Sequence, residues 1–152
     1  MNPFQSLRSY EEYVYTLPQQ FPSIVSSTLV LARRGRFVGR LSGELTFANG
    51  FRITINERIS QEPASVVIET YGYELWRGTD KLAWYDSQPH PHIPELASTH
   101  PHHKHVPPDI KHNRIPAPNM GFTQPNLPAL IADIDAYQAT LVEAQSDEED
   151  TD

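Results

Sequence analysis

The hydrophobic residues near the start of the chain recur at the spacing of one helix face. In SLRSYEEYVYTLPQQFP, residues 6–22, the side chains of Tyr10, Val14 and Leu17 stand at i, i+4 and i+7. Ser6 or Ser9 is suited to cap the first turn, and Pro18 is suited to end the helix. The pattern predicts a short helix with a single apolar stripe, which can pack on a sheet.

From Ser26 onward the hydrophobic period changes to two, which is the period of a half-buried strand. Alternation of this kind predicts five strands joined by short turns in an antiparallel meander, over residues 27–34, 36–47, 51–59, 64–76 and 81–86. In the second strand Phe37, Leu41, Leu45 and Phe47 share the inward parity, and in the third strand Phe51, Ile53 and Ile55 share it.

The turn between the second and third strands is predicted from its residues. Asn49 and Gly50 tolerate positive φ, so they are expected to form a two-residue type I′ hairpin turn. The outward parity of the flanking strands then places four arginines on the other face of the sheet: Arg36, Arg40, Arg52 and Arg58.

The C-terminal region changes back to a helical period. Leu130, Ile134, Tyr137 and Leu141 are spaced for one buried face, in a helix that starts at Asn126 or Pro128. The predicted fold class is therefore α+β, with both terminal helices packed on one face of a five-stranded meander. We expect a single domain over residues 1–142, followed by an acidic disordered tail over residues 143–152.

Between the last strand and the final helix lies a segment rich in histidine and proline, residues 87–112. Its prolines argue against a helix and against a central strand, so we expect it to run over the surface as a loop. All seven histidines of the chain lie between His90 and His112.

Composition narrows the classes of function. The chain of 152 residues has no cysteine, so any metal would have to be bound by His, Asp or Glu. The net charge of −7 is uneven, because residues 33–114 carry eleven Lys and Arg against nine Asp and Glu. A basic folded part is compatible with a nucleic-acid ligand. No apolar run suits a membrane span or a signal peptide, so we expect a cytoplasmic protein without a membrane partner.

The histidine segment allows three interpretations. In extended backbone, residues i and i+2 point to the same side, so His90 with His92, or His103 with His105, can offer two imidazoles to one ion. Asp86 or Glu95 can add a carboxylate ligand. Alternatively the imidazoles hydrogen-bond carbonyls and cap neighbouring elements, and have no chemical role. We expect neither a bound metal nor any other cofactor.

The third interpretation is acid/base catalysis on a phosphodiester. Imidazole can serve as the base for a 2′-hydroxyl and as the acid for a 5′-oxygen. The acid/base candidates are His102, His103 and His105, with Lys104 among them and Asp86 to orient one imidazole. The four outward arginines can hold phosphate. The aromatic side chains that can stack on unpaired bases are Tyr71, Tyr73, Trp84 and Tyr85, of which Tyr73 and Tyr85 are taken as the site candidates. In the corresponding structural alternatives, the arginines are solvated or paired with Glu44 and Glu57, and the aromatic side chains belong to the core.

Three stretches of the sequence together resemble the TumE family, the toxin components of bacterial and archaeal toxin–antitoxin pairs. The first is a Tyr-x-Tyr strand, here Tyr71 and Tyr73, and the second is Tyr85 with Asp86. The third is the loop motif, matched here by Pro94-Glu95-Leu96, Pro101, His102, His103, Lys104 and His105. The resemblance covers roughly residues 10–135. It departs from the family pattern at His90-Pro91-His92-Ile93, where adjacent histidines are expected, and at His100, where an aromatic residue is expected.

The resemblance implies a toxin that is neutralised by a separate helix-turn-helix antitoxin protein. Combined with the residues above, it predicts a toxin that acts on RNA as a small, metal-independent ribonuclease. The alternative from another class is a non-enzymatic module that binds a metal or a protein partner through the same histidine segment.

Overall fold

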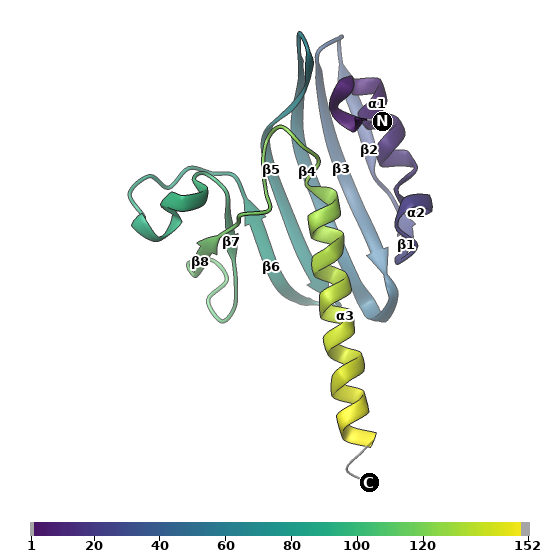
Figure 1. Cartoon of the computed structure of the whole chain (residues 1–152), viewed down its shortest axis with the longest axis vertical. Helices are drawn as coiled ribbons and strands as arrows, with labels where there is room; N and C mark the ends of the chain where they lie inside the picture. Colours follow the sequence, from purple (N-terminus) through teal and green to yellow (C-terminus); the bar gives the residue numbers. More distant parts are fainter. Residues whose placement is uncertain (1, 150–152) are drawn as a thin grey trace.

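The computed structural model describes residues 2–149, and their side chains as far as Ala144. It is an α+β structure with one antiparallel sheet and helices at both ends (Figure 1). The strands run in the order β1-β3-β4-β5-β6-β7-β8, and β2 also pairs with β3. Their bounds are β1 Ile24–Ser27, β2 Val30–Arg34, β3 Val38–Phe47, β4 Phe51–Glu62, β5 Ser65–Arg77, β6 Asp80–Asp86, β7 His103–His105 and β8 Arg114–Pro116.

The predicted fold class is confirmed, but the prediction of five strands is wrong because the sheet has eight. The five expected strands correspond to β2–β6, which form the predicted meander. The additional strand β1 pairs with the end of β3 beyond the part that pairs with β2. The chain passes very close to β3 between these two strands, because a Cβ on Gly43 would lie 2.6 Å from the Thr28 carbonyl oxygen. Glycine is required there.

The turn between β3 and β4 is one residue longer than predicted. Thr46 pairs with Arg52, so the register centres the loop on Asn49 and the loop has three residues, Ala48–Gly50 (η2). Asn49 and Gly50 have the expected positive φ, 63° and 79°. The predicted inward residues of both strands are buried, except Phe37, which lies before β3 and is 60% exposed.

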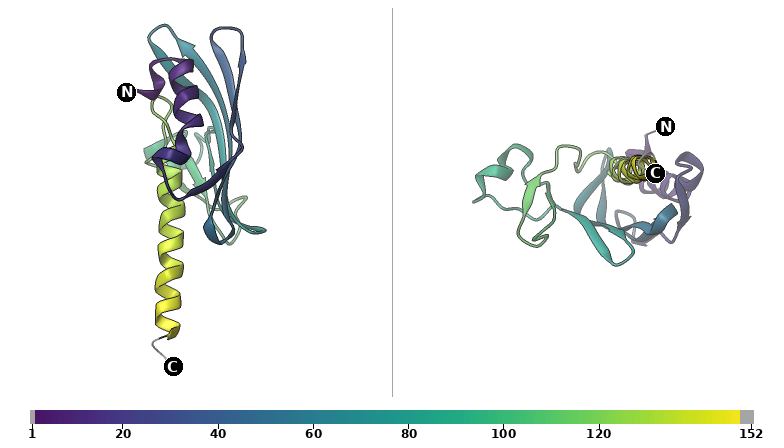
Figure 2. Two further views of the ribbon diagram at one scale, coloured as in Figure 1. Left: turned by 90° about the vertical axis from the view of Figure 1, so that its right-hand side faces the viewer. Right: turned by 90° about the horizontal axis from the view of Figure 1, so that it is seen from below.

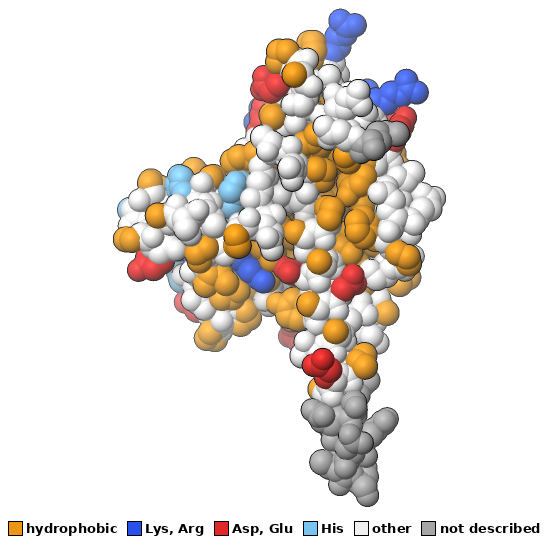
Figure 3. Space-filling model, in the orientation of Figure 1, with side chains coloured by type: hydrophobic (Ala, Val, Ile, Leu, Met, Phe, Trp, Pro, Cys, Tyr) orange, Lys and Arg blue, Asp and Glu red, His pale blue; other side chains and the backbone are white. Residues whose placement is uncertain are grey.

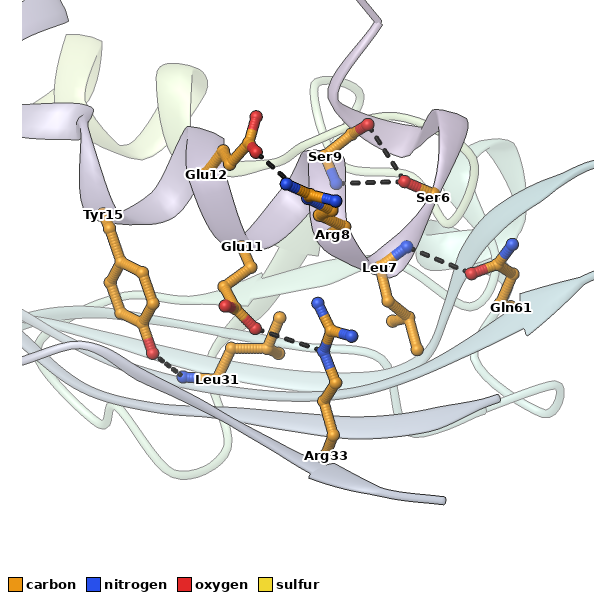
Figure 4. A network of polar contacts seen from close by, with 10 residues as sticks. All are labelled: Ser6, Leu7, Arg8, Ser9, Glu11, Glu12, Tyr15, Leu31, Arg33 and Gln61. Carbon is orange, nitrogen blue, oxygen red and sulfur yellow. Dashed lines mark hydrogen bonds and ion pairs between the residues drawn. The ribbon is translucent and has the colours of Figure 1, made fainter. Parts of the chain in front are cut away.

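The helices lie on one face of the sheet (Figure 2). After a short turn η1 (Pro3–Gln5), α1 (Leu7–Tyr15) begins at Ser6, whose hydroxyl accepts a hydrogen bond from the Ser9 N–H. A further turn, α2 (Leu17–Gln20), contains Pro18 in its first turn. Polar contacts also join α1 to the sheet (Figure 4): Leu7 N–H to Gln61 Oε1, Leu31 N–H to the Tyr15 hydroxyl, and Arg33 to Glu11.

The C-terminal helix α3 (Leu127–Glu149) packs its predicted face on the sheet. Leu130 and Ile134 are buried, and Tyr137 and Leu141 are partly buried. A disordered tail was expected from residue 143 onward, but the backbone of residues 143–149 is helical. No glycine or proline follows Pro128, so no residue of low helix propensity interrupts the helix. Residues 150–152 of that tail lie outside the described residues. No helix within the described part of the chain has the length and apolar character needed to cross a membrane.

The histidine segment folds into an arm at the edge of the sheet that contains η3 (Pro94–Thr99), β7 and β8 (Figure 1). The prediction of a surface loop without a central strand is wrong, because β7 lies between β6 and β8. The prolines at 101 and 107 flank this strand and do not interrupt it, so its backbone groups remain free to pair on both sides.

A buried polar network joins the helices to the sheet. The Glu57 carboxylate accepts hydrogen bonds from the hydroxyls of Tyr10, at 2.5 Å, and Tyr73. Asn126, just before α3, donates to the Tyr73 hydroxyl at 3.1 Å. Burial raises the pKa of Glu57 to about 6, against the lowering effect of the two tyrosine hydrogen bonds. Glu57 was considered from the sequence as a partner for arginines, but it lies on the inward parity of β4.

Candidate functional site: a histidine hollow on the open sheet face

Strand β7 divides the histidine motif between the two faces of the sheet. Pairing with β6 sets His105 opposite Trp84 and His103 opposite Asp86, while Lys104 lies opposite Tyr85. Side chains alternate along a strand, so His103 and His105 share a face with Trp84 and Asp86. This is the open face, by which we mean the face that the helices do not cover. Lys104 and Tyr85 lie on the helix side.

The imidazoles of His103 and His105 meet edge to edge. Their Nε2 atoms are 3.2 Å apart. Each Nδ1 contacts a backbone carbonyl oxygen, that of Pro101 at 3.1 Å for His103 and that of Ile110 at 2.8 Å for His105. The residues are 1% and 2% exposed. Contrary to the expectation of an exposed loop, they form a fixed, buried pair.

The carboxylate of Asp86 completes this cluster. One oxygen of Asp86 and one ring nitrogen from each of the two histidines all lie within 4.8 Å of one another. Asp86 itself is held by the Gln88 N–H, which donates to its Oδ1 at 2.7 Å. Asp86 thus lies beside the two histidines, and its role in orienting an imidazole stays a prediction.

A surface hollow of about 420 Å³ opens beside the pair, and we call it the histidine hollow. The indole of Trp84 stacks on the His105 ring, with centroids 4.2 Å apart. The ring of His90 lies 5.0 Å from that of His103, centroid to centroid. The lining residues are Lys81, Trp84, Asp86, Gln88, His90, His105, Ile110, Lys111 and Arg114.

The hollow combines neutral imidazoles with fixed cations. Burial lowers the pKa of His90 and of His105, and nearby positive charge, including that of Arg114, lowers both further. In His105 the hydrogen bond to the Ile110 carbonyl opposes this lowering. Lys81 is paired with Glu74 at 2.5 Å. Arg114 Nε is enclosed and has no hydrogen-bond partner among the described residues.

Two of the predicted catalytic residues lie away from this hollow, on the helix side. His102 contacts the Tyr71 hydroxyl through Nδ1 at 2.7 Å and stacks on the Tyr71 ring. Burial lowers the pKa of His102. Lys104 Nζ lies 3.7 Å from Asp133 Oδ2 of α3, and the Tyr85 hydroxyl donates to the same carboxylate. The structure thus separates His102 and Lys104 from His103 and His105.

The two tyrosines predicted to bind RNA are also on the helix side. Tyr73 is 0% exposed and donates its hydroxyl to Glu57, and Tyr85 is 7% exposed. Burial raises the pKa of both phenols well above its ordinary value. In this fold neither ring offers a free face to a base, which corresponds to the core alternative drawn from the sequence.

The four predicted arginines have different surroundings. Arg40 and Arg58 stand opposite one another on β3 and β4, and with Arg34 they line a second hollow on the open face. Arg58 is paired with Glu69 at 2.9 Å, and Arg52 with Glu44 at 3.4 Å. Arg40 has no ion pair within the described residues. Arg36 lies exposed in the turn before β3.

Three cationic residues that line the histidine hollow were not proposed as site residues from the sequence: Lys81, Lys111 and Arg114. His90 was considered from the sequence only as a metal ligand together with His92. Trp84 was considered as a stacking residue, but Tyr85 was preferred. Parity alone favours Trp84, because it shares the face of Asp86 in β6 and Tyr85 does not. No sequence signal brings Lys111 and Arg114 to β6, since their position follows from the pairing of β7 with its neighbours.

Taken together, the fold and the hollow define a small single-sheet α+β protein with a cationic, histidine-containing site at one end of its open face. The family described as Toxin TumE matches residues 14–138, and the chain therefore belongs to the TumE toxin family. This confirms the resemblance noted in the sequence and assigns the chain a toxin role. No curated protein and no solved structure matches it.

Proposed function

We propose that this toxin acts on RNA as a small ribonuclease and that the histidine hollow is its active site. The observation that carries the proposal is the composition of the hollow. One surface depression is lined by three kinds of group: the indole of Trp84, a cluster of imidazole and carboxylate groups that includes His105, and three cationic side chains that include Arg114. The family membership supplies the toxin role, and the substrate is inferred from the chemistry.

The cationic residues are suited to the phosphate group. Arg114 lines the hollow, so the outer N–H groups of its guanidinium can make charge-assisted hydrogen bonds with a phosphate oxygen there. Lys111 on the rim adds a second positive charge. Strong cations at this point stabilise the charge that develops on a phosphodiester during cleavage.

Trp84 is suited to an unpaired base. It is partly exposed, it lines the histidine hollow, and it also borders a neighbouring hollow on the open face with Asn56 and Glu74. One base stacked on an aromatic side chain contributes about 1–3 kcal/mol to single-strand binding. Single-stranded RNA is therefore the substrate class that the hollow fits best.

The reaction we propose is attack of a 2′-hydroxyl oxygen on the adjacent phosphorus. The new bond from O2′ to phosphorus replaces the bond from phosphorus to O5′, which gives a 2′,3′-cyclic phosphate and a 5′-hydroxyl end. The cluster of His103, His105 and Asp86 takes the proton of the 2′-hydroxyl and then gives a proton to the leaving O5′, so that it ends in its starting protonation state. General acid/base catalysis of this kind contributes about 10²–10⁴-fold to the rate.

The first prediction tests this site directly. His105→Ala should lower cleavage of single-stranded RNA by a factor on the order of 10²–10⁴ and should relieve growth inhibition on induced expression. Cleavage is measured with purified protein, and circular dichroism reports whether each variant is folded. His112→Ala is the matched control, because His112 is exposed and paired with Asp109 outside the hollow.

The ribonuclease proposal fails if wild type neither slows growth nor cleaves RNA, or if folded His105→Ala keeps full toxicity. The alternative is then a binding module that acts as a toxin through a metal or a protein partner.

We also propose that the neutralising partner is a helix-turn-helix protein. Membership of a toxin family implies an antitoxin, and the resemblance to TumE indicates this type. Co-expression of the chain with a helix-turn-helix protein encoded beside it should restore growth and give a complex that co-purifies. Restored growth with an unrelated fold as the partner would contradict this assignment.

A further inference from the structure

The hydrogen bonds of His103 and His105 fix their tautomers so that two nitrogen lone pairs face one another. A carbonyl oxygen only accepts hydrogen bonds, so the contacts with Pro101 O and Ile110 O place a proton on each Nδ1. In two neutral imidazoles the Nε2 atoms then both carry lone pairs. These lone pairs face one another across 3.2 Å, which is repulsive unless a cation or a proton lies between them.

The distance between the two nitrogens fits a shared metal ion. Two imidazole nitrogens bound at about 2.0–2.1 Å, with a tetrahedral angle between them, lie roughly 3.3 Å apart. The Nε2 atoms are already at this separation without any rearrangement. The alternative that would also place the nitrogens in contact is one shared proton in an N–H···N hydrogen bond.

The groups around the two histidines favour a metal ion over a shared proton. The Asp86 carboxylate stands within 4.8 Å of one ring nitrogen of each histidine and provides a third donor. Each Nδ1–H is bonded to a backbone carbonyl, which is the outer arrangement that fixes the ring orientation of metal-binding histidines. All three donors come from β6 and β7, two paired strands, so the backbone holds their relative positions.

We propose that His103, His105 and Asp86 form a binding site for one divalent first-row transition-metal ion, with the Nε2 atoms and the carboxylate as ligands. Two imidazoles and one carboxylate suit Zn²⁺ or Mn²⁺, and they leave a coordination position open. His105 and Asp86 both line the histidine hollow, so this position faces it. Lys111 and Arg114 surround the hollow, and their charges favour an anion, such as a phosphate oxygen, at that position.

The assignment goes beyond the proposed ribonuclease activity and does not depend on it. A metal ion here is a property of the folded chain, whether its role is catalytic or structural. If RNA is the substrate, an ion bound to both Nε2 atoms would occupy the lone pairs that the imidazoles need as bases. A water bound to the ion would then supply the base for the 2′-hydroxyl, and the ion would polarise a phosphoryl oxygen. The sequence allowed a metal at this pair, although none was expected.

The test measures metal binding in the full chain, purified without a polyhistidine tag and dialysed against chelator. Titration with Zn²⁺ by calorimetry should give one strong site, and Co²⁺ should give the visible absorption bands of a bound ion. His103→Ala and Asp86→Asn should each weaken this site by more than about 100-fold, because ligand loss exceeds the usual effect of losing an outer-shell partner. His92→Ala and His112→Ala should leave it unchanged, since both residues are exposed.

The variants differ in their risk of unfolding, so a second measurement is included. Asp86→Asn keeps the size of the side chain, so this variant is expected to fold. Independently of any variant, X-ray absorption of the wild-type complex should show two imidazole nitrogens bound directly to the ion. The proposal is overturned if wild type binds no ion and shows no change in Tm on metal addition. It is also overturned if the exposed-histidine variants abolish binding while the His103 variant retains it, or if nitrogen NMR shows one shared proton with no metal affinity. A site that binds metal while wild type leaves RNA intact supports this inference and counts against the proposed ribonuclease alone.

Discussion

At the scale of single residues, Glu57 shows how burial and hydrogen bonding oppose one another. Its carboxyl group is 0% exposed, yet it accepts hydrogen bonds from two tyrosines and lies among apolar residues of the core. Burial is the larger effect, and the pKa is raised to about 6. Acids in this position make the free energy of unfolding depend on pH in the opposite sense to that of surface carboxylates.

We predict that Glu57 makes the protein less stable as pH rises from about 4.5 to 6. The folded state binds the proton more tightly than the unfolded state, whose pKa is near the ordinary value of 4.5. The stabilisation is therefore complete below the unfolded pKa and is lost as pH rises through the folded one. A difference of 1.5 pKa units corresponds to about 2 kcal/mol.

The measurement is urea unfolding of wild type and Glu57→Gln between pH 4 and 7. Other carboxyl groups titrate in this range, so the informative quantity is the difference between the two proteins. That difference should shift by about 2 kcal/mol across the range, with wild type losing relative stability as pH rises. A difference that stays constant with pH would mean that the pKa of Glu57 is not raised.

At the scale of secondary-structure elements, neighbouring residues of β7 point to opposite faces of the sheet and have different surroundings. His103 and His105 face the open side, whereas Lys104 faces α3 and lies 3.7 Å from Asp133. Lys104 matches the family motif as well as the histidines do, but its position indicates that it helps to hold α3 against the sheet.

We therefore predict that Lys104→Met reduces stability and leaves RNA cleavage in place. A partly buried ion pair of this length contributes up to about 1 kcal/mol, and the Met side chain keeps the apolar part of the lysine contact with Tyr85. Thermal unfolding and RNA cleavage are measured on the same preparation. Loss of cleavage with unchanged stability would instead assign Lys104 to the active site.

The turn between β3 and β4 provides a second test at this scale. Gly50 has a φ of 79°, which strains any β-branched residue, so Gly50→Val should lower the free energy of unfolding by roughly 2 kcal/mol. Gly50→Asn is the matched control, because asparagine tolerates positive φ and should cost clearly less. Equal stability of the valine and asparagine variants would show that the loop relaxes into another conformation.

Sequence patterns predicted the elements well where one face of an element is buried. The period of two in β3 and β4 and the helical spacing of Leu130 and Ile134 gave the correct inward residues, because burial dictates both patterns. The strand β7 was missed because its three residues show no such hydrophobic pattern. They are two histidines and a lysine, and the histidines are buried by contacts with Trp84 and the carbonyl of Ile110.

The candidate site was predicted only in part, because some of its residues come together through strand pairing that has no signal in the sequence. The i, i+2 relation of His103 and His105 and the presence of Asp86 could be read from the sequence. Their grouping with Lys111 and Arg114 depends on the pairing of β6, β7 and β8 across long connections. The choice of Tyr85 over Trp84 overlooked the alternation of side chains within a strand, which was available from the sequence.

At the scale of the whole molecule, the two sheet faces differ in character. Seen from the helix side, hydrophobic side chains follow the strip between α1 and α3, and lysine and arginine side chains are sparse (Figure 3). The arginine pair of Arg40 and Arg58 and the histidine hollow both lie on the opposite, open face. Three strand spacings separate β3 from β6, or roughly 15 Å, which a few nucleotides of single-stranded RNA can span.

We predict that RNA follows this open face from the histidine hollow toward Arg40, and that its affinity depends on salt accordingly. Each phosphate contact to single-stranded RNA contributes about 0.7 to the slope of log K against log salt concentration, because it releases a bound counterion. Arg40→Ala should thus weaken binding to RNA of any sequence and reduce the slope by about 0.7.

Arg40 is the most informative residue to change, since Arg52 and Arg58 are already paired with Glu44 and Glu69. The matched control is Arg33→Ala on the neighbouring strand β2, where the side chain points to the helix side and pairs with Glu11. Binding of a short fluorescent RNA is measured by anisotropy at several salt concentrations. If both variants lower the slope equally, the effect is one of net charge, and if neither does, the RNA does not cross the open face at Arg40.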